Sequence, residues 1–357
     1  MTCPPSSPPR RVAVVGAGIS GAACARALVQ AGVHVTVFDK SRGPGGRMST
    51  RRAESVDGHP LAFDHGAQYF TARDPAFVAE VLAAQAAGCL APWRPRMPVN
   101  PRPDDAERWV ALPGMPDLVR HWLVPGPRLR TVWPFQVTEL SRHGRQWALK
   151  TNEATHPESF DDVVLAMPPE QAAVLLAPHR PDWARQAAAT PMWPCWTLMA
   201  LTDAVDWPFD AARPSALQPQ HPLGWLARQD DKPGRPRHPR WQAWVAQATP
   251  AWSQAHLEAP TDEVRHALLL ALFDALGTST QAPAVAHAAV HRWRYAQPAR
   301  TDEAPDPSAA THWHDPDLQL AVCGDFLGGG RVESAWLSGH RLAQSMMTCT
   351  NAGTGAA

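Results

Sequence analysis

The chain of 357 residues is long enough for two domains with sizeable hydrophobic cores. Its 33 basic and 33 acidic side chains balance, which excludes a broad charge that would favour nucleic acid or an anionic membrane surface as a partner. The longest apolar helical stretch, residues 264–276, is interrupted by charged side chains and falls short of the roughly 20 residues that span a bilayer, so we expect no membrane partner.

The first residues and the cysteine pattern predict the cellular compartment of the protein. Residues 1–10 are rich in Pro and Ser and lack the apolar stretch of a secretory signal, so we expect a flexible tail. The six cysteines are scattered, and no two are spaced as Cys-X-X-Cys. This pattern is typical of a reducing compartment and predicts a cytoplasmic location.

The first predicted elements are a strand, a helix and a second strand. Residues 11–15 are a short β-branched run, residues 19–31 are rich in Ala, and residues 33–38 are again β-branched. Together they predict one right-handed βαβ unit. A glycine fingerprint lies in the turn that opens the helix, at Gly16, Gly18, Ile19, Ser20 and Gly21.

Each glycine of this fingerprint has a separate physical task. Gly16 permits the tight turn, Gly18 lets the backbone approach a pyrophosphate, and Gly21 lets the helix pack closely on the sheet. The first amides of the helix then face the phosphates. Asp39 ends the second strand at about the spacing expected of a carboxylate that binds a ribose 2′-hydroxyl. These residues predict a dinucleotide site but do not choose between FAD and NAD.

A second glycine-rich segment favours FAD. Residues 42–47 follow the second strand directly, where an NAD-binding domain would begin its next crossover helix. Gly46 lets the backbone approach the cofactor, and Arg47 offers a fixed cation to the pyrophosphate. By itself this segment also fits a flexible surface loop. Residues 64–69, Asp-His-Gly-Ala-Gln-Tyr, make the FAD interpretation the stronger one.

The next stretch returns to the nucleotide domain after an irregular excursion. Residues 92–107 are rich in Pro, Arg and Asp and predict a surface loop. Residues 131–140 and 147–151 predict a hairpin, and residues 162–166 predict a buried strand.

Between about residues 183 and 291 the pattern of predicted elements changes. Apolar strands at residues 196–201 and 242–248 alternate with Pro-rich loops, and residues 261–276 predict a helix. This pattern indicates a second domain inserted between parts of the first.

The chain closes with a strand that ends at Gly324 and Asp325, a helix over residues 332–347 and a small polar tail. The expected fold is therefore α/β, with a Rossmann-like FAD-binding domain of parallel strands and helices and an inserted mixed β/α substrate domain. The expected boundaries are residues 1–75, 125–180 and 288–347 for the FAD-binding domain, 76–124 and 181–287 for the substrate domain, and 1–10 and 348–357 for flexible tails.

Several segments along the chain are distinctive when taken together. Near the start these are GAGISGAACARAL, FDKSRGPGGRMSTRR and DHGAQYFTARD. Later segments are WVALPGMPDLVRHWL, VVLAMPPEQA, WLARQDDKPGR, HRWRYAQP and CGDFLGGGRVESAWLSG. These segments resemble the flavin-containing amine oxidase superfamily, and specifically its renalase-like branch, and the resemblance runs over nearly the whole chain.

The resemblance implies a set of FAD contacts. Residues 16–21 would form the phosphate loop, Asp39 would bind the ribose, and Arg47 would reach the pyrophosphate or ribityl chain. The backbone of Val137, on a strand between the domains, would meet the adenine. The helix that starts near Val332 would point its N-terminus at the flavin ring. Further implied contacts are Lys40, Gly46, Ala67, Gln68, Gly324, Asp325, Arg331 and Glu333.

The same resemblance places catalytic candidates beside the flavin, namely Gln68, Tyr69, Gln247, Trp293 and Tyr295. On periodicity alone, residues 292–295 also fit an ordinary edge strand. Trp225, Trp244 and Trp252 are candidates for the wall of a substrate cavity or for plain core packing.

Two departures from the family pattern bear on cofactor and substrate. Residues 327–331 contain no Cys that would hold the flavin covalently, which predicts noncovalent FAD. Gln247 stands where renalase-like chains usually carry His, and a carboxamide forms hydrogen bonds but does not titrate near neutral pH. The pairs His287 and His291, or His312 and His314, lack a third ligand at supporting spacing, so we expect no metal site.

The predicted function is an FAD-dependent oxidoreductase that transfers a hydride from a small molecule to flavin N5. The resemblance implies that the donor is a dihydronicotinamide dinucleotide isomer and that O2 accepts the electrons as H2O2. Three alternatives remain open: an oxidase of primary or secondary amines, a flavin-binding protein without turnover, and an NAD-dependent dehydrogenase.

Overall fold

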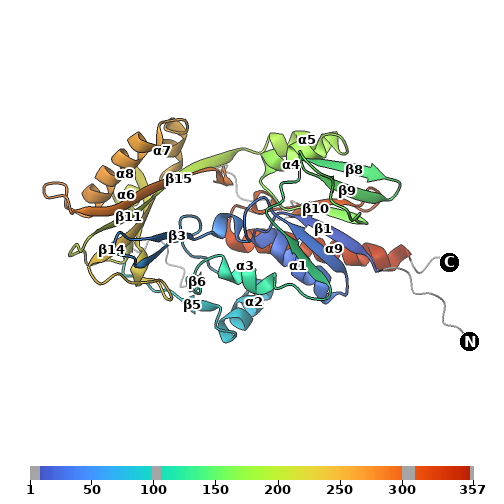
Figure 1. Ribbon diagram of the computed structural model, residues 1–357, viewed down its shortest axis with the longest axis horizontal. Coiled ribbons are helices and arrows are strands. Elements are labelled where there is room, and N and C mark those ends of the chain that lie inside the picture. The colour runs from blue at the N-terminus through green and yellow to red at the C-terminus, as the bar shows by residue number, and fades with distance from the viewer. Residues whose placement is uncertain (1–8, 99–105, 300–309, 354–357) are drawn as a thin grey trace, which may run out of the picture. The chain divides into compact units, whose positions relative to one another are not determined.

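The computed structural model describes residues 9–98, 106–299 and 310–353, and the chain forms two compact units (Figure 1). Unit 1 comprises Met1–Gly46, Val119–Pro191 and Arg300–Ala357. Unit 2 comprises Arg47–Leu118 and Met192–Ala299. Neither unit is one continuous stretch of sequence.

Unit 1 is built on a six-stranded sheet. In spatial order its strands are β16 (His312–Asp315), β17 (Leu320–Cys323), β10 (Asp162–Leu165), β1 (Arg11–Val15), β2 (His34–Phe38) and β7 (Leu129–Val132). All neighbours are parallel except β16, which runs antiparallel to β17. The four central strands are almost entirely buried, as expected of a parallel sheet covered on both faces.

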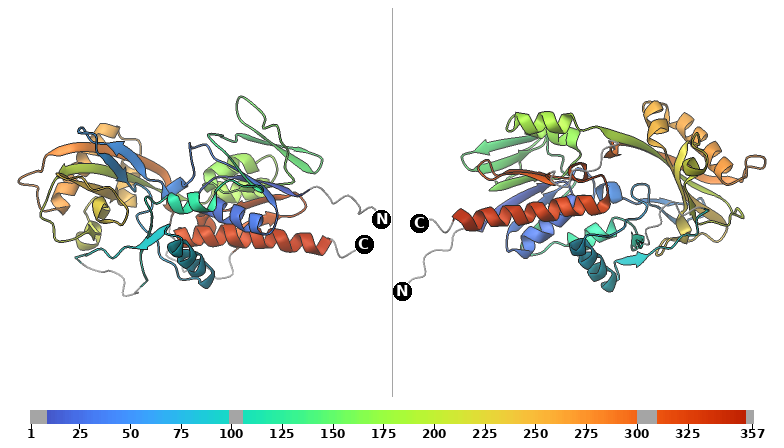
Figure 2. Two further views of the ribbon diagram at one scale, coloured as in Figure 1. Left: turned by 60° about the horizontal axis from the view of Figure 1, so that its bottom comes forward. Right: turned by 180° about the vertical axis from the view of Figure 1, so that it is seen from behind.

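Two layers cover this sheet. On one side, α1 (Ile19–Gln30) runs alongside α9 (Val332–Gly353) (Figure 2). A Cβ on Gly339 of α9 would lie 2.0 Å from the carbonyl oxygen of Ser20, so only glycine lets the two helices approach this closely. On the other side lie the hairpin β8 (Glu139–His143) and β9 (Gln146–Lys150), with α4 (Pro169–Leu176) and α5 (Pro181–Ala188).

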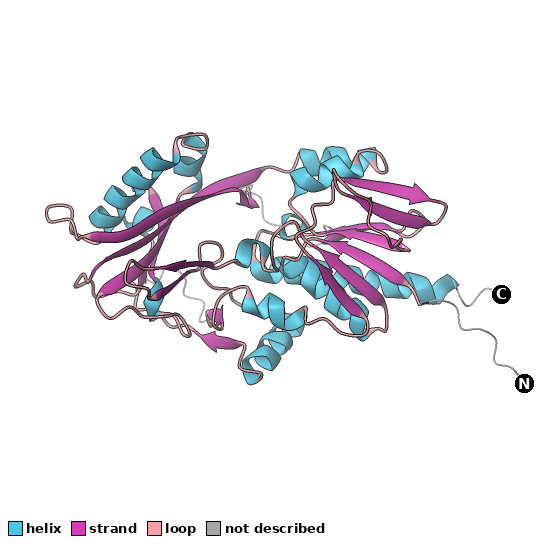
Figure 3. Ribbon diagram, viewed as in Figure 1, coloured by secondary structure: helices cyan, strands magenta, loops and turns pink. Residues whose placement is uncertain are grey.

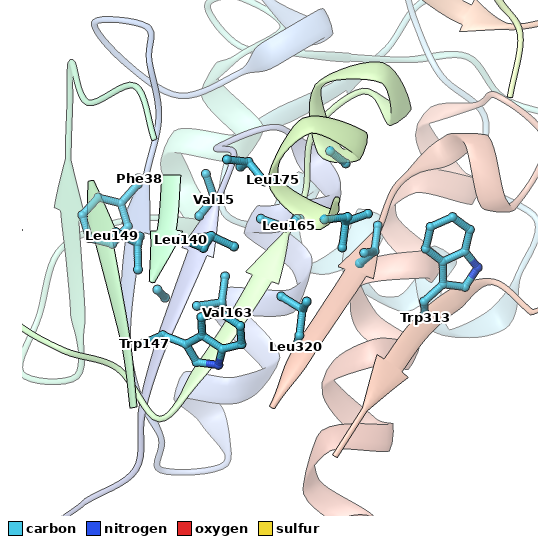
Figure 4. Packing of buried hydrophobic residues seen from close by; sticks show 14 of the residues in the cluster. Val15, Phe38, Leu140, Trp147, Leu149, Val163, Leu165, Leu175, Trp313 and Leu320 are labelled. Atoms are coloured by element: carbon cyan, nitrogen blue, oxygen red, sulfur yellow. The ribbon is translucent and has the colours of Figure 1, made fainter. Parts of the chain in front are cut away.

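The core between the sheet and this hairpin is tightly packed with large side chains. Trp147 and Leu149 meet the alternate strand residues Val163 and Leu165, all of them fully buried (Figure 4). Phe160, 1% exposed, belongs to the same core. The parallel sheet and its two layers give the Rossmann-like α/β fold predicted from the sequence.

Unit 2 is built on a five-stranded antiparallel sheet. Its spatial order is β12 (Ala211–Ala212), β13 (Leu223–Arg228), β14 (Trp241–Ala248), β11 (Met192–Asp203) and β15 (Val285–Pro298). One face packs against α8 (Thr261–Ala275), with α7 (Pro250–Ala255) nearby (Figure 3). Leu198 and Trp244 on this face contact Leu268 and Leu272 in one core.

The opposite face of this sheet is divided between two kinds of side chain. At one end, Leu61 and Phe63 of the hairpin β3 (Arg51–Glu54) and β4 (Pro60–Phe63) pack against Met199, Leu201 and Val245. At the other end, cross-strand pairing places a row of polar and aromatic residues side by side, Trp225, Gln247, Thr197 and His291.

The remaining elements are not strands of the two large sheets. They are η1 (Gly46–Met48), α2 (Pro75–Ala86), β5 (Leu90–Pro92), β6 (Trp109–Ala111), α3 (Asp117–Trp122), α6 (Pro214–Leu217), η2 (Gln229–Asp231) and η3 (Asp325–Leu327). Within the described part of the chain, no helix has the length and apolar character needed to cross a membrane.

The units divide the chain differently from the boundaries expected from the sequence. Residues 47–75 and 288–299, expected in the FAD-binding domain, lie in unit 2, because the hairpin β3–β4 covers its sheet and β15 completes that sheet. Residues 119–124 and 181–191, expected in the substrate domain, lie in unit 1.

Smaller expectations also need correction. The observed hairpin starts at Glu139, because Thr131 and Val132 pair with β2 in the parallel sheet. Arg10, placed in the N-terminal tail, forms an ion pair with Asp162 at 2.6 Å. The last helix continues beyond residue 347 to Gly353. Residues 1–8, 99–105 and 354–357 of the expected tails and surface loop lie outside the described residues.

Candidate functional site

The glycine fingerprint of unit 1 has the geometry of a phosphate-binding turn. Gly16 has φ +117°, and a Cβ there would lie 2.2 Å from the carbonyl oxygen of Ala166. A Cβ on Gly21 would lie 2.0 Å from the carbonyl oxygen of Gly16. Gly18 differs, because a Cβ there would meet no atom within 4 Å. The first and third glycines are therefore required by packing, whereas the second faces open space.

The end of β2 folds against this turn. The Oδ2 of Asp39 accepts a hydrogen bond from the backbone N–H of Ala17 at 2.7 Å. Gly45 donates its N–H to the carbonyl of Ala17 at 2.9 Å, and Gly46, with φ +52°, lies over Gly18. The Nζ of Lys40 lies 3.3 Å from Oε1 of Gln171 on α4.

The closing segment of unit 1 comes to the same edge of the sheet, because β17 is parallel to the strands that carry the turn. Gly324 donates its N–H to Ser338 Oγ at 2.9 Å, and Gly330 donates to the carbonyl of Asp325 at 3.0 Å. The exposed Arg331 then precedes α9, which begins at Val332 and has Glu333 in its first turn. Ligands of open α/β sheets bind outside the carboxyl ends of such strands.

Val137 is placed differently from the prediction. It lies in an irregular segment between β7 and β8, within unit 1, and packs against the core rather than forming part of a strand.

These residues fit the adenosine and pyrophosphate end of FAD. The helix α1 begins after Gly18 without a side chain that caps its first amides, and Ile19 and Ser20 in its first turn are buried. The amides and the open space at Gly18 are therefore available to a phosphate, and the Asp39 carboxylate stands beside them.

The other predicted site residues gather in unit 2, around the segment of residues 64–69. Gln247 Nε2 donates to the carbonyl of Gly66 at 2.7 Å, and Trp293 Nε1 donates to the carbonyl of His65 at 2.8 Å. Ala67 donates its N–H to the carbonyl of Arg47 at 2.8 Å. The polar end of the sheet face therefore holds this segment, and the amide N–H of Gln247 is used in doing so.

One histidine of this segment, His65, and its neighbour His291 on β15 are neutral at pH 7. The ring of His65 stacks on Trp293 and meets His291 edge to face at 4.8 Å. Burial lowers the pKa of His65 to about 4, with the neighbouring His291 adding to the effect. Burial likewise lowers the pKa of His291 to about 4.

A fully buried ionic cluster lies on the other side of the segment. The Asp64 carboxylate accepts from Arg235 Nη2 at 2.7 Å, from Gln229 Nε2 at 2.7 Å, and from Thr50 Oγ1 at 2.6 Å. Lys232 Nζ lies 3.3 Å from Asp64 Oδ2 and donates to Gln68 Oε1 at 3.0 Å. The side chains of Asp64, Lys232 and Arg235 are all 0% exposed. One carboxylate therefore faces two cations.

This imbalance sets the protonation of the cluster. Burial by itself raises the pKa of Asp64, but the charges of Lys232 and Arg235 outweigh it and hold that pKa below its ordinary value. Burial lowers the pKa of Lys232 to about 8, against the opposing charge of Asp64. At pH 7 the side-chain amine of Lys232 is therefore protonated, and it donates a hydrogen bond to the side chain of Gln68.

The aromatic candidates separate into two groups. Tyr69 and Trp225 lie near each other, with ring centroids 5.4 Å apart, and Tyr295 follows Trp293 by two residues on β15. Trp244 lies on the opposite face, in the α8 core, and donates to Thr202 Oγ1 at 3.1 Å. Trp252 stacks on His256 beside the same core. These last two residues have the core-packing role.

The predicted histidine pairs show other contacts. His287 stacks on Phe63, and His314 Nδ1 lies 3.1 Å from Ser345 Oγ. A separate group of Asp57, His59 and His238 brings three possible ligand atoms within 4.8 Å of one another. His238 Nδ1 accepts from the backbone N–H groups of Arg240 and Trp241, so its Nε2 carries the proton that Asp57 accepts. A protonated Nε2 does not ligate a metal.

Sequence reasoning missed the partners of Asp64. Lys232, Arg235 and Gln229 lie in a charged stretch with a Pro and a Gly, which is also typical of a solvated loop. Their only signal was that this stretch belonged to one of the segments that resembled the family.

Comparisons with known proteins agree with this architecture. Residues 14–84 match a model of the NAD(P)-binding Rossmann-like domain, and residues 105–347 match the model of flavin containing amine oxidoreductases. The fold is similar to a putative protoporphyrinogen oxidase from Exiguobacterium sp. 255-15, with a TM-score of 0.70 and 13% identity over 95% of this chain and 99% of that one. It is also similar to cyclohexylamine oxidase from Brevibacterium oxydans IH-35A, with a TM-score of 0.69 and 14% identity over 96% and 100% of the two chains.

Matches to curated sequences are short. A desaturase of hydroxyneurosporene from Rubrivivax gelatinosus is 42% identical over 99 residues, which is 25% of this chain and 18% of that protein. The bifunctional protein MnmC of tRNA 5-methylaminomethyl-2-thiouridine biosynthesis from Thiobacillus denitrificans is 46% identical over 57 residues, or 16% of this chain and 8% of that protein. This chain thus covers under a fifth of the length of either relative.

The amine oxidoreductase model covers more than half of the chain, and the fold and the phosphate-binding turn agree with it. The chain therefore belongs to the family of flavin-containing amine oxidoreductases, whose cofactor is FAD.

Proposed function

We propose that the protein is an FAD-dependent oxidase whose hydride donor is a dihydronicotinamide dinucleotide isomer, as in the renalase-like branch. Bound FAD supplies the hydride-accepting atom, flavin N5, and O2 takes the two electrons onward as H2O2. The rest of the chemistry is binding and orientation by the chain's own residues.

In this proposal unit 1 holds the nucleotide end of FAD. The amides after Gly18 face the pyrophosphate and Asp39 binds the ribose, with Lys40, Gly324 and Asp325 alongside. The binding is noncovalent, since Cys323 and Cys24 in this unit are buried and burial raises the pKa of each thiol, that of Cys323 to about 12.

In unit 2 the proposed roles are orientation and exclusion of water. Gln68 and Ala67 would orient the donor and the flavin, and Gln247 and Trp293 hold the backbone of the segment that carries them. Tyr69 and Tyr295 supply aromatic walls for the donor ring.

The observation that carries the proposal is that none of the titratable groups described around Gln68 is placed to act as a base at pH 7. His65 and His291 are neutral with low pKa values, Lys232 is protonated, and Gln247 does not titrate. The Asp64 carboxylate is occupied by two cations. Hydride transfer from a dihydronicotinamide ring needs no proton abstraction, so these groups suit it.

The test is anaerobic mixing of the purified yellow protein with dihydronicotinamide isomers and, separately, with primary and secondary amines. We expect bleaching of the flavin absorbance by at least one dihydronicotinamide isomer, and H2O2 when air is admitted. If only amines bleach the flavin, the donor is an amine and the proposed donor is wrong. If neither class of compound bleaches it, the protein binds flavin without turnover of these compounds.

Two features of the cofactor are checked in the same preparation. Heating should release free FAD into the supernatant, because the binding is noncovalent. A colourless protein that releases no FAD would instead be an NAD-dependent dehydrogenase or another nucleotide-binding protein.

A further inference from the structure

Three aromatic rings of unit 2 form a group next to Gln68. Trp225 lies 5.4 Å from Tyr69 and 6.4 Å from Trp93, and Tyr69 lies 6.0 Å from Trp93, measured between ring centroids. Trp93 is 2% exposed and Trp225 is 7% exposed. Tyr69 follows Gln68 in the chain, so the group adjoins the residues to which we assign the donor.

A cationic side chain lies over each of the three rings. Arg213 lies 5.5 Å from the Trp225 ring, Arg108 lies 5.5 Å from the Tyr69 ring, and Lys232 lies 5.1 Å from the Trp93 ring. Lys232 has Asp64 as its counter-ion. Arg213 donates through Nη2 to the Tyr69 hydroxyl at 3.3 Å, and no carboxylate of the described residues forms an ion pair with it.

Two donors in this group lack acceptors. The Nε of Arg213 and the Nε1 of Trp225 are buried, and neither has a hydrogen-bond partner among the described residues. Buried donors in proteins are nearly always paired, and a buried N–H of a charged group without an acceptor is costly. Two neighbouring unpaired donors, one of them cationic, therefore indicate an acceptor that arrives with a ligand.

We propose that Arg213 and Trp225 bind a phosphate group of the substrate. This inference rests on the proposed function and adds the residues that recognise the donor's charge. A guanidinium suits a phosphate because it offers several N–H groups in one plane. An alkylammonium substrate would instead meet the guanidinium of Arg213, which opposes its binding.

The test compares two donors that differ only in the phosphate, a reduced nicotinamide mononucleotide isomer and the matching riboside. For the wild-type holoenzyme we expect kcat/KM to be at least tenfold higher with the mononucleotide. Arg213→Gln should reduce this ratio about tenfold or more, because the variant loses the guanidinium that distinguishes the mononucleotide from the riboside. Arg213→Lys should fall between the two, since it keeps the charge but not the planar donors.

Two further variants separate recognition from folding. Trp225→Phe keeps an aromatic ring but removes Nε1, and it should also lower the ratio. Arg94→Gln is the matched control, because Arg94 is 78% exposed and pairs with Glu107. An unchanged ratio in both Arg213→Gln and Trp225→Phe, or an equal loss with both donors, would overturn the proposal.

Binding measurements keep this inference distinct from the proposed function. If no dihydronicotinamide isomer is oxidised, the proposed function fails, and calorimetry of the holoprotein with the same two compounds still tests the phosphate site. Tighter binding of the mononucleotide that is lost in Arg213→Gln would support the site. Equal binding of the two compounds, or amine turnover that Arg213→Gln leaves unchanged, would overturn it.

Discussion

Asp64 is the single residue on which most of the buried charge in unit 2 depends. Its carboxylate is the one acidic group between the ammonium of Lys232 and the guanidinium of Arg235 within that cluster. Breaking a buried ion pair on one side leaves an uncompensated charge in a medium of low polarity, which costs more than the pair itself contributes.

We therefore expect Asp64→Asn to be strongly destabilising. The change leaves the two buried cations without a counter-ion, and its cost should be about 3–5 kcal/mol in the free energy of unfolding. Urea denaturation followed by tryptophan fluorescence measures it through the shift of the midpoint.

The matched control is Asp182→Asn, which makes the same chemical change in an ion pair with Arg180 where the aspartate is 52% exposed. Because an exposed ion pair contributes little to stability, this control should leave the urea midpoint close to that of the wild type. Adding Lys232→Met to Asp64→Asn should recover part of the loss. A midpoint for Asp64→Asn equal to that of the control would show that the cluster is not what stabilises unit 2.

The site residues show what sequence reasoning reaches and what it does not. Gln68 was proposed because it lies in a segment that resembles the family, and Gln247 because it stands where renalase-like chains usually carry His. The structure adds that Gln247 donates to the backbone carbonyl of Gly66. Lys232 and Arg213 were missed, because their burial depends on contacts with residues more than a hundred positions away. Charge and spacing along the sequence do not reveal such contacts.

The turn between β1 and α1 supplies a test of cofactor binding that separates packing from function. Gly18 has φ −76° and ψ −179°, a conformation open to any residue, and its Cβ position is empty. Gly18→Ala should change the free energy of unfolding of the cofactor-free protein by about 1 kcal/mol or less. It should nevertheless weaken FAD binding at least tenfold, because the new methyl group occupies the place of the pyrophosphate.

Substitutions of two other glycines are the controls for Gly18→Ala. Gly126→Ala meets no atom within 4 Å and lies away from the turn, so it should keep both stability and FAD. Gly21→Ala should unfold or strongly destabilise the protein, because its Cβ would collide with the Gly16 carbonyl. Flavin fluorescence titration and urea denaturation measure the two properties separately. Normal FAD affinity in Gly18→Ala would contradict the assignment of this turn.

These local elements were also the most predictable part of the fold. The strand–turn–helix at residues 11–31 and the helix at residues 261–276 follow from hydrophobic periodicity and glycine placement, and both are observed. Thr131 and Val132 were assigned to a hairpin because an isolated strand pattern does not say which neighbour it pairs with. In the structure their partner is β2, nearly a hundred residues earlier.

Domain boundaries were the least predictable feature of the chain as a whole. Residues 47–75 follow the first βαβ unit without a break in composition, yet Leu61 and Phe63 cover the sheet of unit 2. No local property of the sequence marks this crossing, since it is decided by which core the two side chains complete.

This arrangement predicts that the contiguous stretch of residues 192–299 does not fold alone. Without residues 47–118 its sheet would expose Met199, Leu201 and Val245 and would leave Lys232 and Arg235 without Asp64. We expect the isolated stretch to show no cooperative urea transition, whereas co-expression with residues 47–118 should restore one. If the fragment of residues 47–118 carries Asp64→Asn, the restored urea transition should have a lower midpoint. The hydrophobic contacts would then form without the counter-ion of Lys232 and Arg235. The prediction would be wrong if residues 192–299 alone unfolded cooperatively at the same urea midpoint as the two co-expressed fragments. That result would show that the sheet of unit 2 is stable without β3–β4.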